Sequence, residues 1–283
     1  MIERTVKAMN SPSVWDAEIP LPSGYRAGHL LKRTKRTEIW TALTADERPR
    51  AIKLIQLVDP QAMMHDKGVL DGLRNMRHGQ LVSIDWISSH RNLLMVVMEL
   101  AQGSLGDLFD NQLGQFGVPW PASKVCRYLV QAAQALDFLN TCQHPRGGQL
   151  VALQHGNLKP SNLLRIGSTV KVTDPKLSSQ TNYEQAGDRL LGTLRYAAPE
   201  VFHGWVSEHS DQYALAVIYC EFRGGRRPFR DPPAGVDPGY VRPEPDLTMV
   251  SEIERDHVAR ALAVCPHDRW PSCEAFITEL SRE

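Results

Sequence analysis

Side chains able to handle a phosphate and a metal ion gather in residues 153–164, LQHGNLKPSNLL. The stretch holds four such residues: His155, Asn157, Lys159 and Asn162. Asp174 follows ten residues after its end. The amide oxygen of Asn162 and the carboxylate of Asp174 are hard oxygen ligands, which suit a Mg²⁺ ion that bridges the phosphates of a nucleotide. Asn157 can accept a hydrogen bond but cannot take up a proton at any useful pH.

The elements before residue 100 are predicted to be mainly strands. Residues 37–43 and 50–57 are rich in β-branched and aromatic residues and flank TADERP, which predicts a hairpin. Residues 81–87 and 93–100 predict a second antiparallel pair. Residues 63–76 have apolar residues at helical spacing, weakened by two glycines.

Helices are predicted to dominate the rest of the chain. Residues 123–141 carry an apolar stripe at helical spacing, and residues 211–222 are apolar all round, as a buried central helix should be. Residues 162–174 predict a tight hairpin around a Gly-Ser pair. Two further helices are predicted at 251–264 and 272–280.

Composition is that of an ordinary globular protein, with 42% hydrophobic and 23% charged residues. The 32 Lys and Arg residues balance the 32 Asp and Glu residues, so no overall field favours nucleic acid or an anionic membrane. No run reaches the ~18 apolar residues of a membrane span, and the N-terminus lacks the apolar core of a signal peptide. These features predict a cytoplasmic protein without a membrane span.

The five cysteines form no CxxC pair, and we expect them to be buried free thiols in a reducing compartment. They are Cys126, Cys142, Cys220, Cys265 and Cys273.

Seven short motifs occur in the order in which a protein kinase domain has them. They are AIKL (51–54), MEL (98–100), HGNLKPSN (155–162), TDPK (173–176), GTLRYAAPE (192–200), SDQYALAV (210–217) and CPHDRWPS (265–272). From about residue 24 to 280 the chain therefore resembles a protein kinase, closest in style to the bacterial eukaryotic-like serine/threonine kinases.

The resemblance implies an α+β, two-lobed protein-kinase fold. An N-terminal extension would span residues 1–22, a small β-rich N-lobe 23–98 and a larger, mainly α-helical C-lobe 99–283, with the single kinase-like domain at 23–281.

The resemblance also implies a site for ATP and Mg²⁺. Lys53 would bind phosphate, Lys159 would contact the transferred phosphate, and Asn157 stands in the general-base position. The nucleotide site would comprise Ile39, Ala51, Lys53, Met98, Glu99, Asn162 and Asp174, with Asn162 and Asp174 as the Mg²⁺ ligands. Four other matches have structural roles in the family. His155 would pack and hydrogen-bond within the catalytic loop, and Asp211 would tie the backbone of that loop to the central helix. Glu200 and Arg269 would form a buried ion pair.

Three departures from the family pattern bear on catalysis. Asn157 replaces the base aspartate, and loss of a general base typically costs about 10²–10⁴ in rate. The glycine-rich loop falls on Lys32, Thr34 and Thr37, so no glycine lets backbone amides approach a phosphate. Pro175 replaces the phenylalanine after Asp174 and biases Asp174 towards an extended backbone.

Two charged contacts of the family are also changed. Val69 falls where a glutamate holds the phosphate-binding lysine, with Asp66 and Asp71 nearby but out of register. Gly156 replaces an arginine that pairs with an activation-segment phosphate. The basic residues Lys32, Arg33, Lys35 and Arg36 either supply charge to a phosphate or an acidic partner, or form a solvated hairpin tip.

Two other segments bear on partners. Ser178, Ser179, Thr181 and Thr193 are candidates for phosphorylation by another kinase. Residues 231–246 hold five prolines and predict an irregular loop, which either loses the family's docking helix or offers an extended Pro-rich segment to a partner.

Three functional hypotheses follow. The first is a catalytically impaired kinase-like protein, a pseudokinase acting as a scaffold or regulatory module for a protein partner such as an active kinase or a phosphoprotein. The second is a weakly active ATP-dependent serine/threonine kinase, and the third a nucleotide-gated switch without turnover. ATP and Mg²⁺ binding separates these hypotheses, because a pure scaffold needs neither.

Overall fold

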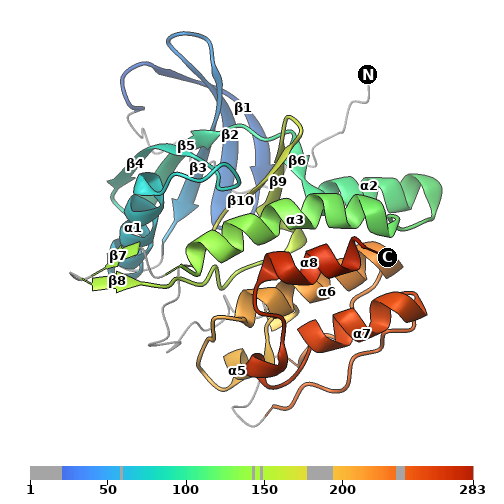
Figure 1. Ribbon diagram of the computed structural model, residues 1–283. Helices are drawn as coiled ribbons and strands as arrows, with labels where there is room; N and C mark the ends of the chain where they lie inside the picture. The colour runs from blue at the N-terminus through green and yellow to red at the C-terminus, as the bar shows by residue number, and fades with distance from the viewer. Residues whose placement is uncertain are drawn as a thin grey trace. The chain divides into compact units, whose positions relative to one another are not determined.

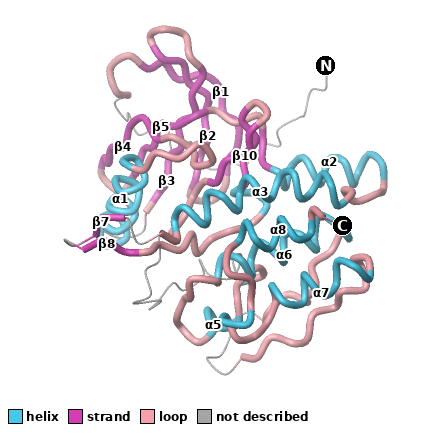
Figure 2. The backbone as a smooth tube through the Cα atoms, in the orientation of Figure 1, coloured by secondary structure: helices cyan, strands magenta, loops and turns pink. Residues whose placement is uncertain are grey.

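The structure, a computed structural model, describes residues 21–57, 60–141, 144–146, 149–176, 194–233 and 240–282. These residues form two compact units, one of residues 21–76 with Ser83–Leu100 and one of Arg77–Val82 with residues 101–282. Strands predominate in the first unit and helices in the second (Figure 1, Figure 2), which confirms the α+β prediction. The predicted extension, residues 1–22, lies almost wholly outside the described residues.

The first unit is built on a five-stranded antiparallel sheet with the order β1-β2-β3-β5-β4. Its strands are β1 (Tyr25–Arg33), β2 (Thr37–Thr44), β3 (Pro49–Gln56), β4 (Ile84–His90) and β5 (Leu93–Glu99), and helix α1 (Pro60–Asn75) packs beside β4. Both hairpins and the helix predicted for this region are confirmed.

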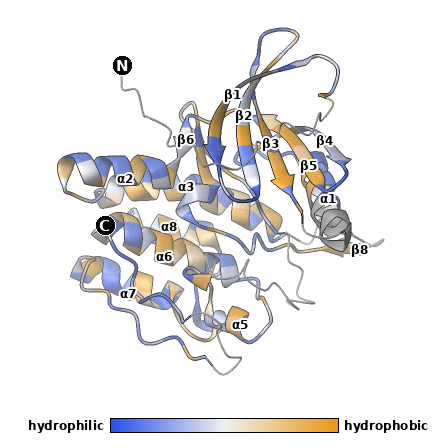
Figure 3. Cartoon of the chain, turned by 180° about the vertical axis from the view of Figure 1, so that it is seen from behind, coloured by the Kyte–Doolittle hydropathy of each residue, from blue (hydrophilic) through white to orange (hydrophobic). Residues whose placement is uncertain are grey.

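One face of this sheet carries the core of the first unit. Leu21, Tyr25 and Trp40 pack against this core. The core itself is formed by buried side chains from three neighbouring strands: Ala42, Ile52, Leu54, Met95 and Val97. Strands β3 and β5 are correspondingly among the most hydrophobic elements in Figure 3. Because successive side chains on a strand point to opposite faces, the residues between these core positions face the other way.

The second unit consists mainly of helices. They are α2 (Leu105–Phe116), α3 (Ala122–Leu139), α5 (Pro199–Phe202), α6 (Ser210–Gly224), α7 (Glu252–Ala261) and α8 (Cys273–Leu280), with the 3-10 turns η2 (Pro160–Asn162) and η3 (Pro266–Asp268). Short strands complete it: β6 (Gly103–Ser104), β9 (Leu163–Ile166) and β10 (Thr169–Val172) in one sheet, and β7 (His144–Arg146) with β8 (Gln149–Val151) in another.

Helix α6 is the centre of the second unit. Twelve of its residues are buried, including Tyr213, Tyr219 and Phe222, which confirms the prediction of an all-round apolar helix. Helix α3 packs against α6, α8 and β10. The hairpin β9–β10 follows directly after the stretch that holds the predicted site, so α3, α6 and this hairpin fix the backbone of that stretch.

Helix α2 and strand β1 were not predicted from the sequence. Helix α2 begins with a capping box, in which the Ser104 hydroxyl accepts from the Asp107 amide (3.1 Å) and the Asp107 carboxylate accepts from the Ser104 amide (3.2 Å). It ends at Gly117, whose φ of +69° is the left-handed conformation that glycine adopts without strain.

The expectation of buried cysteines is wrong at one position. Cys126, Cys220 and Cys273 are buried free thiols, but Cys265 is exposed, because it lies in the turn that enters η3 and not inside a helix. Cys142 lies outside the described residues. Among those residues, no helix is long and apolar enough to cross a membrane.

Candidate functional site

One face of the five-stranded sheet brings together four residues that the sequence assigned to nucleotide binding. Ile39 lies opposite Lys53, and Ala51 lies opposite Met98. Opposed side chains on antiparallel strands share a face, as do residues two apart on one strand, so all four lie on the face away from the core cluster. Ala51 and Met98 are buried, whereas Ile39 and Lys53 are partly exposed.

Glu99 does not belong to that face. It lies opposite Arg50, one position along the ladder from the pair of Ala51 and Met98. Its carboxylate accepts a hydrogen bond from the Ser83 amide (3.1 Å). The side chain of Glu99 therefore ties the end of β5 to the start of β4.

Three backbone amides of the turn between β1 and β2 are bonded within the turn itself. The Thr34 hydroxyl accepts from the amides of Thr37 (3.1 Å) and Arg36 (3.4 Å), and the Thr34 amide donates to the Thr37 carbonyl (2.8 Å). A glycine-rich turn binds phosphate by directing amides of this kind at the anion. Here the amides of Arg36 and Thr37 are directed at Thr34 instead.

The four basic side chains of this turn differ in their surroundings: one is paired with a buried carboxylate and three are exposed. The Arg33 guanidinium pairs with Glu38 at 2.9 Å, and Glu38, which is 1% exposed, also accepts from the Trp40 indole (3.0 Å). Arg33 is thus committed to a buried carboxylate. The other three basic side chains are exposed: Lys32, Lys35 and Arg36.

The backbone of the catalytic-loop stretch is held from below by Asp211 of α6. Its carboxylate accepts from the amides of His155 (2.5 Å) and Gly156 (3.0 Å), which confirms the structural role expected for Asp211. Burial raises the pKa of Asp211 although both amides favour its charged form. Gly156 has a φ of +64°, a conformation that strains any residue with a Cβ.

His155 links the loop to the strand that follows it. Its Nε2 lies 3.0 Å from the Thr173 carbonyl, and its Nδ1 lies 3.2 Å from the Asn157 amide. A carbonyl can only accept and an amide N–H can only donate, so the two bonds require the neutral ring with its proton on Nε2. Complete burial lowers the pKa of His155, against the opposing field of Asp211, in agreement with a neutral ring.

Three of the predicted site residues are joined directly in the second unit. The Asn157 side-chain amide donates to the Asp174 carbonyl (2.9 Å), and the Asn162 side-chain amide donates to the Asn157 carbonyl (2.8 Å). The Thr173 amide closes the group by donating to the Asn162 carbonyl (3.0 Å). An aspartate at position 157 could not make the first of these bonds, because a carboxylate has no proton to donate.

The backbone of Asp174 is not extended as the following proline led us to expect. Its φ is +58°, in the left-handed region that aspartate tolerates better than most residues. Hydrogen bonds hold the chain on both sides of it, from Asn157 to the Asp174 carbonyl and from the Lys176 amide to the His155 carbonyl (2.8 Å). These tertiary bonds override the local preference imposed by Pro175, which is itself buried.

The side-chain oxygens of Asn162 and Asp174 are of the donor type that a magnesium ion binds. Since the Asn162 amide nitrogen is bonded to Asn157, its oxygen is the atom that remains to face a cation. Mg²⁺ prefers oxygen ligands and is usually held by one or two protein side chains together with phosphate oxygens. The donor set is therefore adequate for a metal–nucleotide complex.

The remaining predicted residues are placed as follows. Lys159 is partly exposed, with an extended backbone just before η2. Asp71 is exposed on α1, and the side chains of Asp66 and Val69 are outside the described part. The candidate phosphorylation sites also fall outside the described residues: Ser178, Ser179, Thr181 and Thr193.

The predicted ion pair of Glu200 and Arg269 is confirmed. The guanidinium makes two hydrogen bonds of 2.8 Å to the carboxylate, and both side chains are almost fully buried (1% and 0% exposed). Hydroxyls of Ser207 (2.9 Å) and Ser210 (2.7 Å) also donate to Glu200. Burial alone would raise the pKa of Glu200, but the bonds from Arg269 outweigh it and lower the pKa.

Arg242 is a structural residue that the sequence did not reveal. It comes from the Pro-rich stretch, yet it is only 6% exposed. Its guanidinium donates to the carbonyls of Leu194 (2.6 Å), Ala197 (3.0 Å) and Arg195 (3.2 Å) and lies over the Phe229 ring. The described part of this stretch has no regular structure, as predicted, but Arg242 fixes it to the segment before α5.

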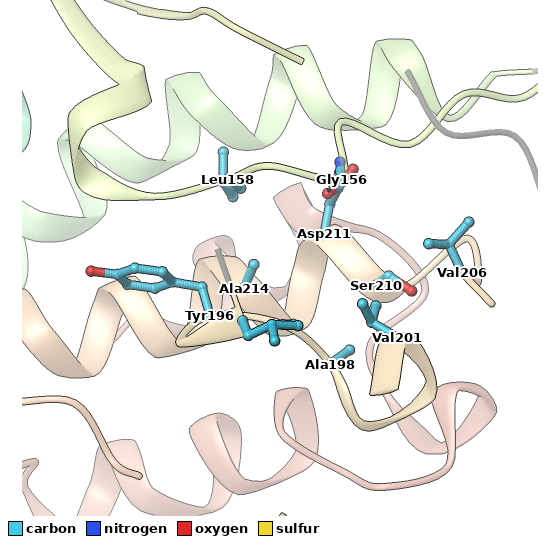
Figure 4. Close-up of a pocket in the computed structure, with 11 residues that line it drawn as sticks. Gly156, Leu158, Tyr196, Ala198, Val201, Val206, Ser210, Asp211 and Ala214 are labelled. Atoms are coloured by element: carbon cyan, nitrogen blue, oxygen red, sulfur yellow. Dashed lines mark hydrogen bonds between the residues drawn. The ribbon is translucent and has the colours of Figure 1, made fainter. Parts of the chain in front are cut away.

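A small, partly open pocket lies next to Gly156 in the catalytic-loop stretch (Figure 4). Apolar side chains such as Leu158, Tyr196 and Val206 line it together with the Asp211 carboxylate. Among the described lining residues there is a carboxylate and no cationic side chain, so this pocket does not suit a phosphoryl group.

An antiparallel sheet with a central lysine, a loop held by a buried helix aspartate and a buried Glu–Arg anchor together define a protein-kinase-type fold. The protein kinase domain matches residues 39–274 of this chain. The chain therefore belongs to the protein kinase family.

Its curated relatives are kinases, among them serine/threonine-protein kinases. CBL-interacting protein kinase 4 of Oryza sativa subsp. japonica is 28% identical over 226 residues, 75% of this chain and 47% of the relative. Serine/threonine-protein kinase H1 of Homo sapiens is 28% identical over 250 residues, 82% of this chain and 55% of the relative. The chain spans about half the length of these two relatives.

Proposed function

We propose that this chain is a catalytically impaired member of the protein kinase family, a pseudokinase that acts as a binding or regulatory module. The observation that carries the proposal is the bond from the Asn157 side chain to the Asp174 carbonyl. The residue in the base position cannot take a proton, and its amide already donates to the backbone of Asp174, a candidate metal ligand. Loss of a general base alone corresponds to about 10²–10⁴ in rate.

The turn between β1 and β2 supports the same proposal. Phosphoryl transfer depends mainly on positioning and on neutralising charge around the transferred group. The amides of Arg36 and Thr37 are bonded to the Thr34 hydroxyl, so these two amides are not available to cover the phosphates. A second part of the transfer machinery is thereby altered, independently of Asn157.

A second candidate is a nucleotide-gated switch, and a weakly active serine/threonine kinase is a third. The orientation of the Asn162 amide favours both, because it leaves an oxygen for Mg²⁺. If a nucleotide binds, Asn162 and Asp174 would hold the ion, Lys53 and Lys159 would face phosphates, and Ile39, Ala51 and Met98 would line the base. The ion would neutralise phosphate charge there.

The proposed partner is a protein, either an active kinase or a phosphoprotein. The exposed cations Lys35 and Arg36 could meet an acidic or phosphorylated surface. A cytoplasmic location and a bacterial origin are part of the proposal, and they rest on the sequence features and motif style described above.

The discriminating experiment is a thermal-shift titration with ATP, ADP and AMP, with and without Mg²⁺, combined with radiolabel transfer from ATP to a generic protein substrate. A ligand that binds the folded state raises its stability by RT ln(1 + [L]/Kd), about 2.7 kcal/mol at a hundredfold excess over Kd. Lys53→Met serves as the variant that removes the phosphate-facing cation.

We expect no transfer above the level of Lys53→Met. A Mg²⁺-dependent shift without transfer would favour the switch, and no shift at millimolar nucleotide would favour the scaffold. Transfer by the natural chain that disappears in Lys53→Met would overturn the pseudokinase proposal.

A further inference from the structure

Three potential metal ligands lie together in the second unit, apart from every residue of the candidate nucleotide site. They are Glu208, His209 and His267, and their ligand atoms all lie within 4.8 Å of one another. Glu208 and His209 directly precede α6, and His267 lies in η3. No motif or ion pair described above gives these three side chains a role.

The distance between the first two ligand atoms matches a metal site. The His209 Nε2 atom lies 3.4 Å from the Glu208 carboxylate. Two ligands bound at 2.0–2.1 Å to a tetrahedral Zn²⁺ ion lie roughly 3.4 Å apart. The separation of the Glu208 and His209 ligand atoms therefore already matches a zinc site, and the third ligand atom, from the exposed His267, lies within 4.8 Å of both.

The backbone that carries these ligands is held by the buried ion pair of the second unit. The Arg269 guanidinium donates to the His209 carbonyl (3.1 Å), and Arg269 lies two residues after His267. The His209 amide donates to the Ser207 hydroxyl (3.2 Å) and its carbonyl also accepts from the Tyr213 amide (3.3 Å). The segment before α6 and the turn η3 are thus fixed relative to each other, as a preorganised site requires.

We propose that Glu208, His209 and His267 bind a Zn²⁺ ion, with water or another ligand at the fourth position. Two imidazoles and one carboxylate form a donor set that zinc accepts in proteins with one position left open. The Arg269 charge nearby is already neutralised by Glu200 at 2.8 Å, so the Glu208 carboxylate gives the site a net negative charge that suits a divalent cation. The ion would tie the start of α6 to η3 and stabilise the second unit.

The test uses the full chain, free of any histidine tag and stripped of metal with a chelator. Isothermal titration with Zn²⁺ is expected to show one ion per chain, and zinc is expected to raise the melting temperature. Co²⁺ in its place is expected to give the intense visible absorption of a four-coordinate ion. His267→Ala and Glu208→Gln each remove a ligand and should weaken zinc binding by more than the roughly tenfold that loss of an outer-shell partner costs. Both positions are exposed, so these variants should fold.

His203→Ala is the matched control, because His203 is an exposed histidine of the same unit outside the cluster. It should leave zinc binding unchanged. The proposal is overturned if no zinc binds, if the bound ion is insensitive to His267→Ala and Glu208→Gln, or if His203→Ala weakens binding as much as they do.

Discussion

Two regions of the molecule pair their polar groups in different ways. One is the anchor around α6, made of Glu200, Arg269 and Asp211, and the other is the turn between β1 and β2. In the anchor, Glu200, Arg269 and Asp211 are the residue types that a protein kinase has at these places, and their polar groups are paired in the folded protein. In the turn, Thr34 replaces a glycine, and its hydroxyl satisfies amides that the family directs at phosphates.

This difference separates the requirements of the fold from those of the reaction. A buried polar group without a partner is costly whatever the protein does, so the anchor is needed even in a chain that transfers nothing. A phosphate cover is needed only for nucleotide chemistry, and its amides can be used to close a turn instead. The catalytic loop combines both cases, since Asp211 holds its backbone while Asn157 occupies the base position.

The largest effect is expected when the anchor is broken. Arg269→Met leaves the Glu200 carboxylate buried without its cation, and such a loss typically costs about 3–5 kcal/mol. The free energy of unfolding, measured by urea denaturation, should fall by that amount. A fall of less than about 1 kcal/mol, the value of an ordinary surface pair, would contradict the role given to this ion pair.

The control for that experiment is Arg282→Met. Arg282 pairs with Glu279, but their side chains are 66% and 31% exposed. Solvent screens such a pair and side-chain entropy opposes it, so the variant should unfold like the natural chain. If Arg269→Met and Arg282→Met lowered the free energy of unfolding equally, the buried ion pair would be no more important for stability than the exposed one.

A smaller effect on the free energy of unfolding is expected at Asn157, which occupies the base position and also bonds to the backbone. Asn157→Asp removes the donor to the Asp174 carbonyl and places a carboxylate oxygen against it. Leaving a buried acceptor without its partner costs about 1–3 kcal/mol, and this bond is only partly buried, so the free energy of unfolding should fall by about 1 kcal/mol, the lower end of that range. Although the variant restores the residue type of a kinase base, transfer from ATP should stay at the background level.

Asn157→Ala is the matched variant for this prediction. It removes the same hydrogen bond without adding a charge, so it should destabilise the chain no more than Asn157→Asp. Radiolabel transfer by Asn157→Asp would show that Asn157 is a removable block on an otherwise competent site. Stability equal to that of the natural chain would show that the bond from Asn157 to the Asp174 carbonyl does not stabilise the fold.

Most helices and strands could be predicted because their residue patterns are local. The β2–β3 hairpin and α6 follow from β-branched runs and from an apolar segment. Strand β1 could not be predicted, because most of its side chains are exposed and show no alternation. Its conformation comes from pairing with β2. Helix α2 was missed although its capping residues Ser104 and Asp107 are local signals.

The site was less predictable because its geometry depends on contacts between distant segments. The left-handed Asp174 contradicts the local preference before proline, and it is held by Asn157, seventeen residues earlier. Arg242 lies in a stretch whose prolines predict an exposed loop, yet it reaches carbonyls 45 to 48 residues away. Neither contact leaves a pattern in the neighbouring sequence.

The smallest predicted effect concerns the proton on His155. Burial lowers its pKa below the ordinary value of 6.5, so the folded state favours the neutral ring. A folded-state pKa that is lowered gives stability that is present above pH 6.5 and is lost as the pH falls through the folded pKa. Two other histidines, His78 and His209, have pKa values lowered in the same direction, so a bulk denaturation curve would mix their contributions.

Long-range ¹H–¹⁵N NMR resolves this mixture residue by residue. The His155 ring should show the tautomer with its proton on Nε2 and should not titrate at pH 6.5. Protonation would put an N–H on Nδ1, facing the Asn157 amide that now donates to it at 3.2 Å, and two donors cannot share that bond. Acid should therefore loosen the backbone at Asn157, and Asn157 should no longer position Asp174. An Nδ1-protonated tautomer, or a midpoint at or above 6.5, would mean that the catalytic loop is not held in the way its hydrogen bonds indicate.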